Sequence, residues 1–204
     1  GLLDASGNAL PVRLQGEAAD TPTATTRTFV LTEASQTLVF AGLTAPPVPS
    51  LLRGFSSPVQ LDIELTDAQL LTLLAHDEDA FNRWEAGQRL ALRTAILLIS
   101  INTHQVSNNV LSDSYIQAMR SVLRHPDLDP SFKELVLTLP SETYIAEQLE
   151  LVDPQRIHAV REAMRENLAQ ALFDDWQWAF GAHQTVGGYS PDAVSSGRRA
   201  LANL

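Results

Sequence analysis

The hydrophobic pattern of the chain changes its period near Thr66, and this change constrains the fold more than any other feature. Before it, Val59, Leu61 and Ile63 alternate with polar residues, as in a strand that buries one face. After it, apolar residues recur every three to four positions, as on the buried face of a helix. We therefore predict a β part followed by an all-α part.

The β part is predicted to hold four or five short antiparallel strands with one buried side. The segment 10–15 follows a turn, and the segment 28–42 contains two β-rich runs around a corner. The alternating run that begins at Val59 completes the set. An extended coil is the alternative interpretation of these residues. Because the sequence opens inside what reads as a strand, we also expect it to be a fragment of a longer chain.

Thr66 is predicted to begin the first helix. The residues from Thr66 to Gln69 form a capping box, in which two side chains bond to backbone N–H groups at the helix start. This helix should end at about His76. Its buried face should be made of leucines, namely Leu70, Leu71 and Leu74.

Capping residues mark the later helix starts as well. A second helix should begin after Asp77 and reach Ile101, with Glu78 and Asp79 in its first turn, where carboxylates complement the helix dipole. Proline at a first helical position loses no needed hydrogen bond. Further starts are predicted at Ser112, Asp129-Pro130, Ser141, Asp153-Pro154 and Ser190-Pro191.

The helix after Asp153 is predicted to be the longest, because apolar residues recur at helical spacing as far as Phe180 and Gly181 supplies a stop. Short connections between successive helices favour antiparallel neighbours, and hence stacked helical pairs. No fixed sequence period is visible, so the residues alone do not indicate a regular repeat family.

The composition excludes several classes of function. A net charge of −10 and an isoelectric point near 4.8 disfavour binding to nucleic acid or to an anionic membrane. The absence of cysteine excludes disulfides, a thiol nucleophile and thiolate metal ligands, and it permits the cytoplasmic location that we expect. The most apolar run, residues 90–101, is interrupted by Arg93 and is too short to span a bilayer.

The histidines do not form a known zinc motif. None of His76, His104, His125, His158 and His183 begins an H-E-x-x-H sequence. His158 and Glu162 are four residues apart on one predicted helix face, close enough to share a metal or a proton. One histidine and one acid cannot complete a tetrahedral site, and Arg161 favours a solvated ion pair instead.

Three further segments allow a functional and a structural interpretation. The sequence HDED at 76–79 resembles a carboxylate cluster, but it lies where acids cap helices. HQTVGGYS at 183–190 could hold an anion or act as a flexible link. FDDWQWAF at 173–180 could stack on a ligand, although aromatic residues at helical spacing usually belong to a core. We therefore assign no catalytic, cofactor-binding or metal residue to this chain.

The proline-rich segment beginning at Leu43 carries the most specific resemblance. It contains PxPSLLRxFSxPV, from Pro47 to Val59, and FxRWxAxQ, from Phe81 to Gln88. These motifs resemble the joint between the small β-sandwich and the C-terminal helical domain of the proteobacterial aminopeptidase N family, which are gluzincin zinc aminopeptidases. Collinear similarities upstream and downstream extend the resemblance over nearly the whole chain.

The resemblance implies a partial Ig-like antiparallel β-sandwich at residues 1–64. A superhelical domain of stacked helical pairs, similar to armadillo or HEAT repeats, is implied at residues 65–204. It also implies that the parent protein removes N-terminal residues from peptides with a zinc ion that polarises the scissile carbonyl and activates water. This chain matches none of the metal ligands of the family, so the fragment should be inactive alone.

In the family, the helical domain caps a peptide chamber and the sandwich acts as its spacer. The implied partners are the catalytic and N-terminal domains of the parent chain and the peptides in its chamber, and an open sheet edge could allow self-association. Leu51, Leu52 and Phe55 should pack at the joint, and Arg53 should pair with an acid there. Four prolines should stiffen the connection, namely Pro46, Pro47, Pro49 and Pro58.

Two other hypotheses stay open. The chain could be an independent interaction module, a sandwich with a helical stack that binds a peptide or a protein partner. A stand-alone enzyme that uses His158 or the HDED cluster is the third and weakest alternative.

Overall fold

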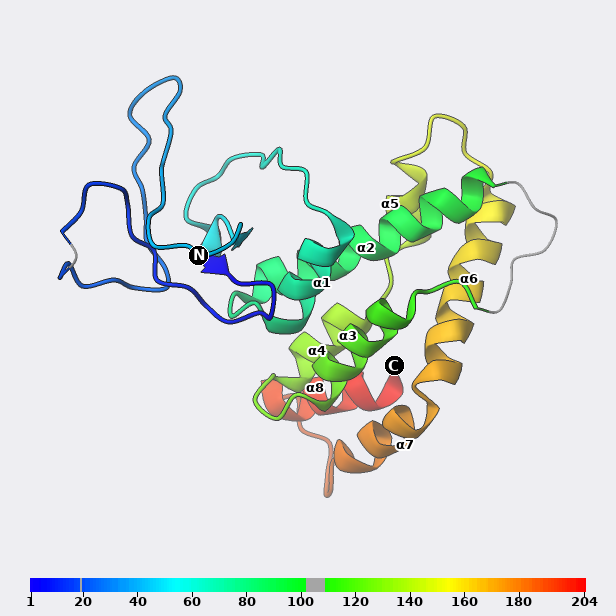
Figure 1. Ribbon diagram of the computed structural model, residues 1–204. Helices are drawn as coiled ribbons and strands as arrows, with labels where there is room; N and C mark the ends of the chain where they lie inside the picture. Colours follow the sequence, from blue (N-terminus) through cyan, green and yellow to red (C-terminus); the bar gives the residue numbers. More distant parts are fainter. Residues whose placement is uncertain (19, 102–108) are drawn as a thin grey trace. The chain divides into compact units, whose positions relative to one another are not determined.

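The structure is a computed structural model that describes residues 1–18, 20–101 and 109–204, so His104 lies outside the described residues. The described chain forms two units, Gly1–Arg83 and Trp84–Leu204 (Figure 1). The division falls inside helix α2, Ala80–Ser100. The proline-rich segment therefore belongs to the first unit, together with the first helix.

A small antiparallel sheet lies at the start of the first unit. Strands β1 (Leu2–Leu3) and β2 (Val48–Pro49) pair with Leu3 opposite Val48. Isolated bridges join Leu3 to Ala9 and Leu14 to Phe40. Leu2, Leu3, Val12 and Val48 are buried and form the core beneath these contacts.

The other predicted strands are not formed in the described part of the first unit. The segments 10–15 and 28–42 contain only single bridge residues, and the run from Val59 to Ile63 is irregular. Val59 and Leu61 are exposed. A strand is stabilised by a continuous ladder of cross-strand hydrogen bonds and by a layer that covers its apolar face. The segments 10–15 and 28–42 share only isolated bonds, such as that from the N–H of Gln15 to the Val39 carbonyl, and the apolar residues Val59 and Leu61 are uncovered. Period-two alternation alone was therefore not enough to predict strands.

Helix α1 (Asp67–His76) begins as predicted. Thr66 accepts a hydrogen bond from the backbone N–H of Gln69, and the Gln69 side chain accepts one from the N–H of Thr66. A 3₁₀ turn, η1 (Arg53–Phe55), lies upstream of it. The buried leucines of α1 are Leu70, Leu73 and Leu74, so Leu73 replaces the predicted Leu71.

The start of α2 differs slightly from the prediction. Glu78 and Asp79 precede the helix instead of lying in its first turn. Asp79 acts as a cap, because its side chain accepts a hydrogen bond from the N–H of Asn82 at 2.9 Å. The helix ends at Ser100, one residue before the predicted Ile101.

Side-chain caps begin four helices of the second unit at the predicted residues. Ser112, Asp129, Ser141 and Asp153 each accept hydrogen bonds from N–H groups of the first turn. The helices of this unit after α2 are α3 (Asp113–Arg124), α4 (Pro130–Leu137), α5 (Glu142–Ala146), α6 (Pro154–Ala171), α7 (Phe173–Ala182) and α8 (Ala193–Asn203).

Two predictions about the last helices are wrong. The single long helix after Asp153 is divided at Leu172, which has φ −112° and ψ 23° and separates α6 from α7 (Figure 1). Gly181 lies within α7 and does not end it. The final helix is capped by Asp192 and does not begin at Ser190-Pro191, because the Asp192 carboxylate accepts a hydrogen bond from the N–H of Ser195.

The core of the second unit forms where α3, α4 and α8 lie side by side (Figure 1). Helices α4 and α8 approach closely because Gly197 lies against Ser131, where a Cβ atom on residue 197 would be 2.2 Å from the Ser131 Oγ. Fully buried side chains of this unit include Met119, Val122, Leu123, Val136, Met164 and Leu201. None of the helices in the described ranges combines the length and the apolarity required to cross a bilayer.

Candidate functional site

Helix α7 turns its large aromatic side chains outward. Its buried face consists of Asp175 and Ala179, next to the fully buried Leu172 that precedes it. Phe173 and Phe180 are 60% and 57% exposed. The prediction that the aromatic residues of this segment belong to the core is therefore wrong for these two side chains. An exposed apolar helix face indicates a contact surface.

Two arginines explain why an acid occupies the inner face of α7. Arg120 and Arg124 of α3 donate hydrogen bonds to the two oxygens of Asp175, at 2.8 and 2.6 Å. Burial acts to raise the pKa of Asp175, but these hydrogen bonds and the two positive charges outweigh it and hold the pKa below its usual range. The Arg124 guanidinium also lies 4.2 Å from the ring centroid of Trp178.

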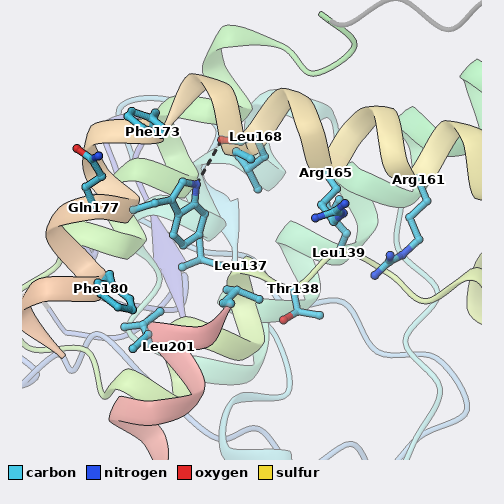
Figure 2. Close-up of a pocket in the computed structure, with 14 residues that line it drawn as sticks. Leu137, Thr138, Leu139, Arg161, Arg165, Leu168, Phe173, Gln177, Phe180 and Leu201 are labelled. Carbon is cyan, nitrogen blue, oxygen red and sulfur yellow. Dashed lines mark hydrogen bonds between the residues drawn. The ribbon is translucent and has the colours of Figure 1, made fainter. Parts of the chain in front are cut away.

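The outer face of α7 forms one wall of a groove with a volume of about 470 Å³. The end of α4 and the end of α8 complete the groove, and Figure 2 shows Leu137, Leu168 and Leu201 around its apolar part. Trp176 lines the groove as well, and its indole N–H donates to the Leu168 carbonyl at 3.5 Å, which is a long hydrogen bond.

Two arginines of α6 lie further along the same groove (Figure 2). Arg161 donates from Nε to the Pro140 carbonyl at 2.9 Å, and Arg165 donates from Nη2 to Glu162 at 2.6 Å. Arg161 Nη1 also lies 3.7 Å from a Glu162 oxygen, so Glu162 pairs with both guanidiniums. The groove thus combines a mainly apolar lining with the two guanidiniums, a composition typical of binding sites.

A braced loop at residues 50–55 is the second notable arrangement, and it lies within the first unit. Arg53 donates from Nη2 to the Asp77 carboxylate at 2.9 Å, from Nε to Ser50 Oγ at 2.7 Å and from Nη1 to Thr26 Oγ1 at 2.7 Å. The side chain of Asp77 has no solvent exposure. The prediction that Arg53 pairs with an acid is confirmed.

Asn82 and Asp79 of the α1–α2 corner add to this bracing. Asp79 accepts a hydrogen bond from the N–H of Gly54 at 2.9 Å. Asn82 donates to Ser50 Oγ at 3.0 Å and to the Leu51 carbonyl at 2.9 Å. Six side-chain hydrogen bonds from Arg53, Asp79 and Asn82 therefore hold the loop.

The backbone of the braced loop is strained. Leu52 and Phe55 have φ values of 53° and 55°, in the left-handed region that glycine adopts more easily. Phe55 is 71% exposed, and its ring lies 4.7 Å from the ring of Phe81. Leu51 is also exposed, so of the packing predicted for Leu51 and Phe55 at the joint, the structure shows only the contact of the Phe55 ring with Phe81.

The predicted candidate residues do not assemble into a reactive site. His158 lies 2.8 Å from Glu142, whereas Glu162 pairs with Arg165. Of the HDED segment, Asp77 and Asp79 belong to the brace. Within residues 1–18, 20–101 and 109–204, no group of three or more histidine, aspartate or glutamate side chains is placed to hold a metal ion.

The comparisons with known families cover both parts of the chain. Residues 67–204 match a domain of unknown function described as ARM repeats, DUF3458_C, and residues 1–64 match a domain of unknown function with an Ig-like fold, DUF3458. The chain belongs to the DUF3458_C family, whose model matches more than half of its residues. The predicted fold class, an Ig-like region followed by an armadillo-like helical domain, is confirmed. The helical repeats have no fixed sequence period, which is why the residues alone did not indicate them.

Curated relatives of this family member are named Aminopeptidase N. The chain is 38% identical to the protein of Caulobacter vibrioides over 87% of its length, and 35% identical to that of Escherichia coli K12 over 85%. The Haemophilus influenzae protein is 32% identical over 85%. The chain covers 19 to 20% of these relatives, about a fifth of their length. The resemblance to the aminopeptidase N family is confirmed.

A solved structure supports the same fold. The crystal structure of Legionella pneumophila aminopeptidase A in complex with aspartic acid superposes with a TM-score of 0.71. The superposition covers 99% of this chain and 22% of that chain, at 24% sequence identity. The described residues of this chain therefore share a fold with one segment of a much larger protein.

Proposed function

We propose that this chain is a non-catalytic segment of a zinc-dependent aminopeptidase, in which it acts as the spacer and cap of a peptide chamber. The observation that carries the proposal is the similarity of 85 to 87% of the chain to proteins named Aminopeptidase N, of which it covers about a fifth. The parent protein removes N-terminal amino acids from peptides. The cysteine-free sequence is compatible with a cytoplasmic location for this activity.

Zinc is the cofactor of the parent protein in this proposal, where it supplies Lewis-acid activation of the scissile carbonyl and of water. The residues of this chain do not fit a zinc site, because the described His, Asp and Glu side chains form no group able to bind it. His158 and Glu142 are an exposed pair without a third ligand. We derive no catalytic step from this chain.

The braced loop supports the spacer role. Pro46 and Pro47 lead into β2, where φ is fixed by the pyrrolidine ring, and Arg53 then ties the following loop to the α1–α2 corner. A short segment that is restricted by proline and by several hydrogen bonds loses little additional entropy when it holds a fixed geometry. Such a segment is suited to act as a rigid spacer rather than as a flexible linker.

The groove lined by α6, α7 and α8 supports a role in contacts with peptide or with the rest of the protein. It offers apolar side chains at one end and the guanidiniums of Arg161 and Arg165 at the other. The partners in this proposal are the catalytic and N-terminal domains of the parent and the peptides in its chamber. Self-association through the exposed β segments is a further proposed contact.

The proposal is tested by hydrolysis of alanine p-nitroanilide. The chain of residues 1–204 with added zinc should show no turnover, and the full-length gene product should cleave the substrate. A chelator should abolish that cleavage, and zinc should restore it. Turnover by residues 1–204 alone, or a full-length protein that is inactive with zinc, would contradict the proposal.

The spacer role has its own test in the full-length protein. Replacement of Pro47 and Pro49 by glycine should broaden the distance distribution measured by small-angle X-ray scattering, because glycine admits many more backbone conformations. Replacement of Pro191, which lies outside the braced region, is the matched control. An unchanged distribution in the Pro47→Gly, Pro49→Gly variant would count against a spacer.

A further inference from the structure

Lys133 is the single lysine among the 14 lysine and arginine residues of the chain, and it is buried. It lies on the inner face of α4 with Val136 and Leu137, and only 3% of its surface is exposed. Within the described residues, its ammonium group makes no hydrogen bond and no ion pair. A buried lysine normally has an anionic partner, because burial of an uncompensated charge is costly.

Two more nitrogen atoms without a partner lie where α7 ends against α8. Arg198 of α8 donates from Nη2 to the carbonyls of Ala182 and Gln184, at 2.9 and 3.1 Å, so its guanidinium lies beside His183, the last cap of α7. Arg198 Nε and His183 Nε2 are both buried, and neither has a hydrogen-bond partner in the part of the chain that the structure describes. Because nearly all buried polar atoms are hydrogen-bonded, such atoms indicate a bound water or ion.

Lys133 belongs to the same corner of the second unit. The contact of Gly197 with Ser131 holds the start of α4 against α8. Burial lowers the pKa of His183, and the positive charges of Lys133 and Arg198 lower it further. Burial lowers the pKa of Lys133 as well. Three basic side chains from three helices therefore lie together in a chain whose net charge is −10.

We propose that Lys133, His183 and Arg198 form a binding site for a divalent oxyanion such as phosphate. Lys133 and Arg198 carry two positive charges, which a dianion compensates together and a single carboxylate does not. A water molecule would satisfy the free N–H groups but would leave both charges uncompensated. His183 contributes a third donor in the tautomer that carries its proton on Nε2. This site goes beyond the proposed function, because it requires no peptidase activity.

The site replaces the Gly-Gly pair as the anion-binding element of the segment 183–190. A Cβ atom at Gly187 or Gly188 would meet no atom within 4 Å, so these glycines do not surround a ligand. Arg199, the next residue of α8, is already engaged. It donates to the Ser190 carbonyl at 2.8 Å and lies 4.7 Å from the ring centroid of Tyr189. Arg199 is therefore a matched control for its neighbour in the site.

Equilibrium dialysis of the full-length protein against radiolabelled inorganic phosphate, at constant ionic strength, tests the inference. Lys133→Met keeps the length of the side chain without its charge, and it should weaken binding at one site per chain by about tenfold or more. His183→Gln should weaken the same site less, and Arg199→Gln should leave it unchanged. Amide hydrogen exchange followed by mass spectrometry locates the site, because phosphate should slow exchange of residues 182–190 in the wild type but not in Lys133→Met.

Three results would overturn the inference. One is wild-type protein in which phosphate leaves the exchange of residues 182–190 unchanged. Another is an equal loss of phosphate binding in Arg199→Gln and in His183→Gln, a comparison that stands even where Lys133→Met does not fold. The third is a Lys133→Met protein that is less stable than the wild type although the wild type binds no phosphate, which would identify a carboxylate of the parent protein as the partner of Lys133.

Discussion

The guanidinium of Arg53 donates a hydrogen bond to the Asp77 carboxylate at 2.9 Å, and solvent reaches 10% of the first side chain and none of the second. The other oxygen of Asp77 has no hydrogen-bond partner within the described residues. Loss of Arg53 would therefore remove the hydrogen-bonded ion-pair partner of a buried carboxylate and leave Arg83, which bonds to the Asp77 carbonyl, as a nearby positive charge. This pair is the central contact of the braced loop.

Arg53→Ala should lower the free energy of unfolding of the first unit by about 3–5 kcal/mol, the usual cost of removing one partner of a buried ion pair. Arg165→Ala is the matched control, because Arg165 pairs with Glu162 at the surface and its loss should cost at most about 1 kcal/mol. Urea denaturation followed by circular dichroism measures both. Equal effects of the two substitutions would show that the Arg53 pair is no more important than a surface contact.

Gly197→Ala should destabilise the second unit by about 1–3 kcal/mol, because the added methyl group overpacks the contact between α8 and α4. The new Cβ would lie 2.2 Å from Ser131 Oγ and 3.0 Å from the Ser131 nitrogen. Ser131→Ala in the same protein should recover part of the loss, since it removes the nearer atom.

Gly181→Ala is the control for this substitution, and its expected sign is opposite. Gly181 is an exposed residue inside α7, and a Cβ there would meet no atom within 4 Å. Alanine should therefore stabilise the helix by about 0.5–1 kcal/mol. Thermal unfolding of both variants measures the contrast, and a destabilising Gly181→Ala would contradict the structure of α7.

Asp175→Asn should make unfolding of the second unit easier at neutral pH but not in acid. The pKa of Asp175 is lower in the folded protein than in the unfolded chain, so its stabilisation is present above the unfolded value of 3.8 and is lost as the pH falls through the folded value. The difference in free energy between wild type and variant should therefore begin to shrink below about pH 4 and vanish only once the pH is below the lowered pKa of the folded protein. Asp174→Asn, an exposed acid in the same turn, should show little difference at any pH.

Leu172→Ala should cost about 2–5 kcal/mol, as expected for a fully buried leucine. Phe180→Ala should change the free energy of unfolding by no more than about 0.5 kcal/mol, because its ring lies at the surface of the groove. Chemical denaturation of both variants distinguishes the two faces of α7. A large loss from Phe180→Ala would mean that the groove is part of the core.

Helix starts could be predicted from the sequence because a cap depends on contacts within one turn. Thr66, Ser112 and Asp153 each accept a hydrogen bond from the N–H three residues further on, so the signal is complete in the local sequence. The helix start predicted at Ser190-Pro191 was wrong because Asp192, two residues after Ser190, caps the helix instead. Both residues fit the pattern, and only the packing of α8 decides between them.

The strands and the groove could not be predicted correctly, because both depend on contacts between residues that are distant in the sequence. Val59 and Leu61 alternate correctly, but a strand also needs a neighbouring strand. In α7, Phe173 and Phe180 define one face and Asp175 and Ala179 another, and amphipathicity favours the aromatic face as the buried one. The face with Asp175 is buried instead, because Arg120 and Arg124 of α3, which are distant in sequence, donate hydrogen bonds to its carboxylate. The helical spacing of these two arginines was the one signal in the sequence that could have indicated an acid as their partner.

The break between α6 and α7 contains neither proline nor glycine at Leu172, the residue where the direction changes. A bend without a chemical breaker is imposed from outside, by the burial of that leucine among its neighbours. A synthetic peptide covering residues 154–182 has no such surroundings, so in a helix-promoting solvent it should form one uninterrupted rod. The break between α6 and α7 is thus caused by the packing of the surrounding helices and not by the local sequence at the break.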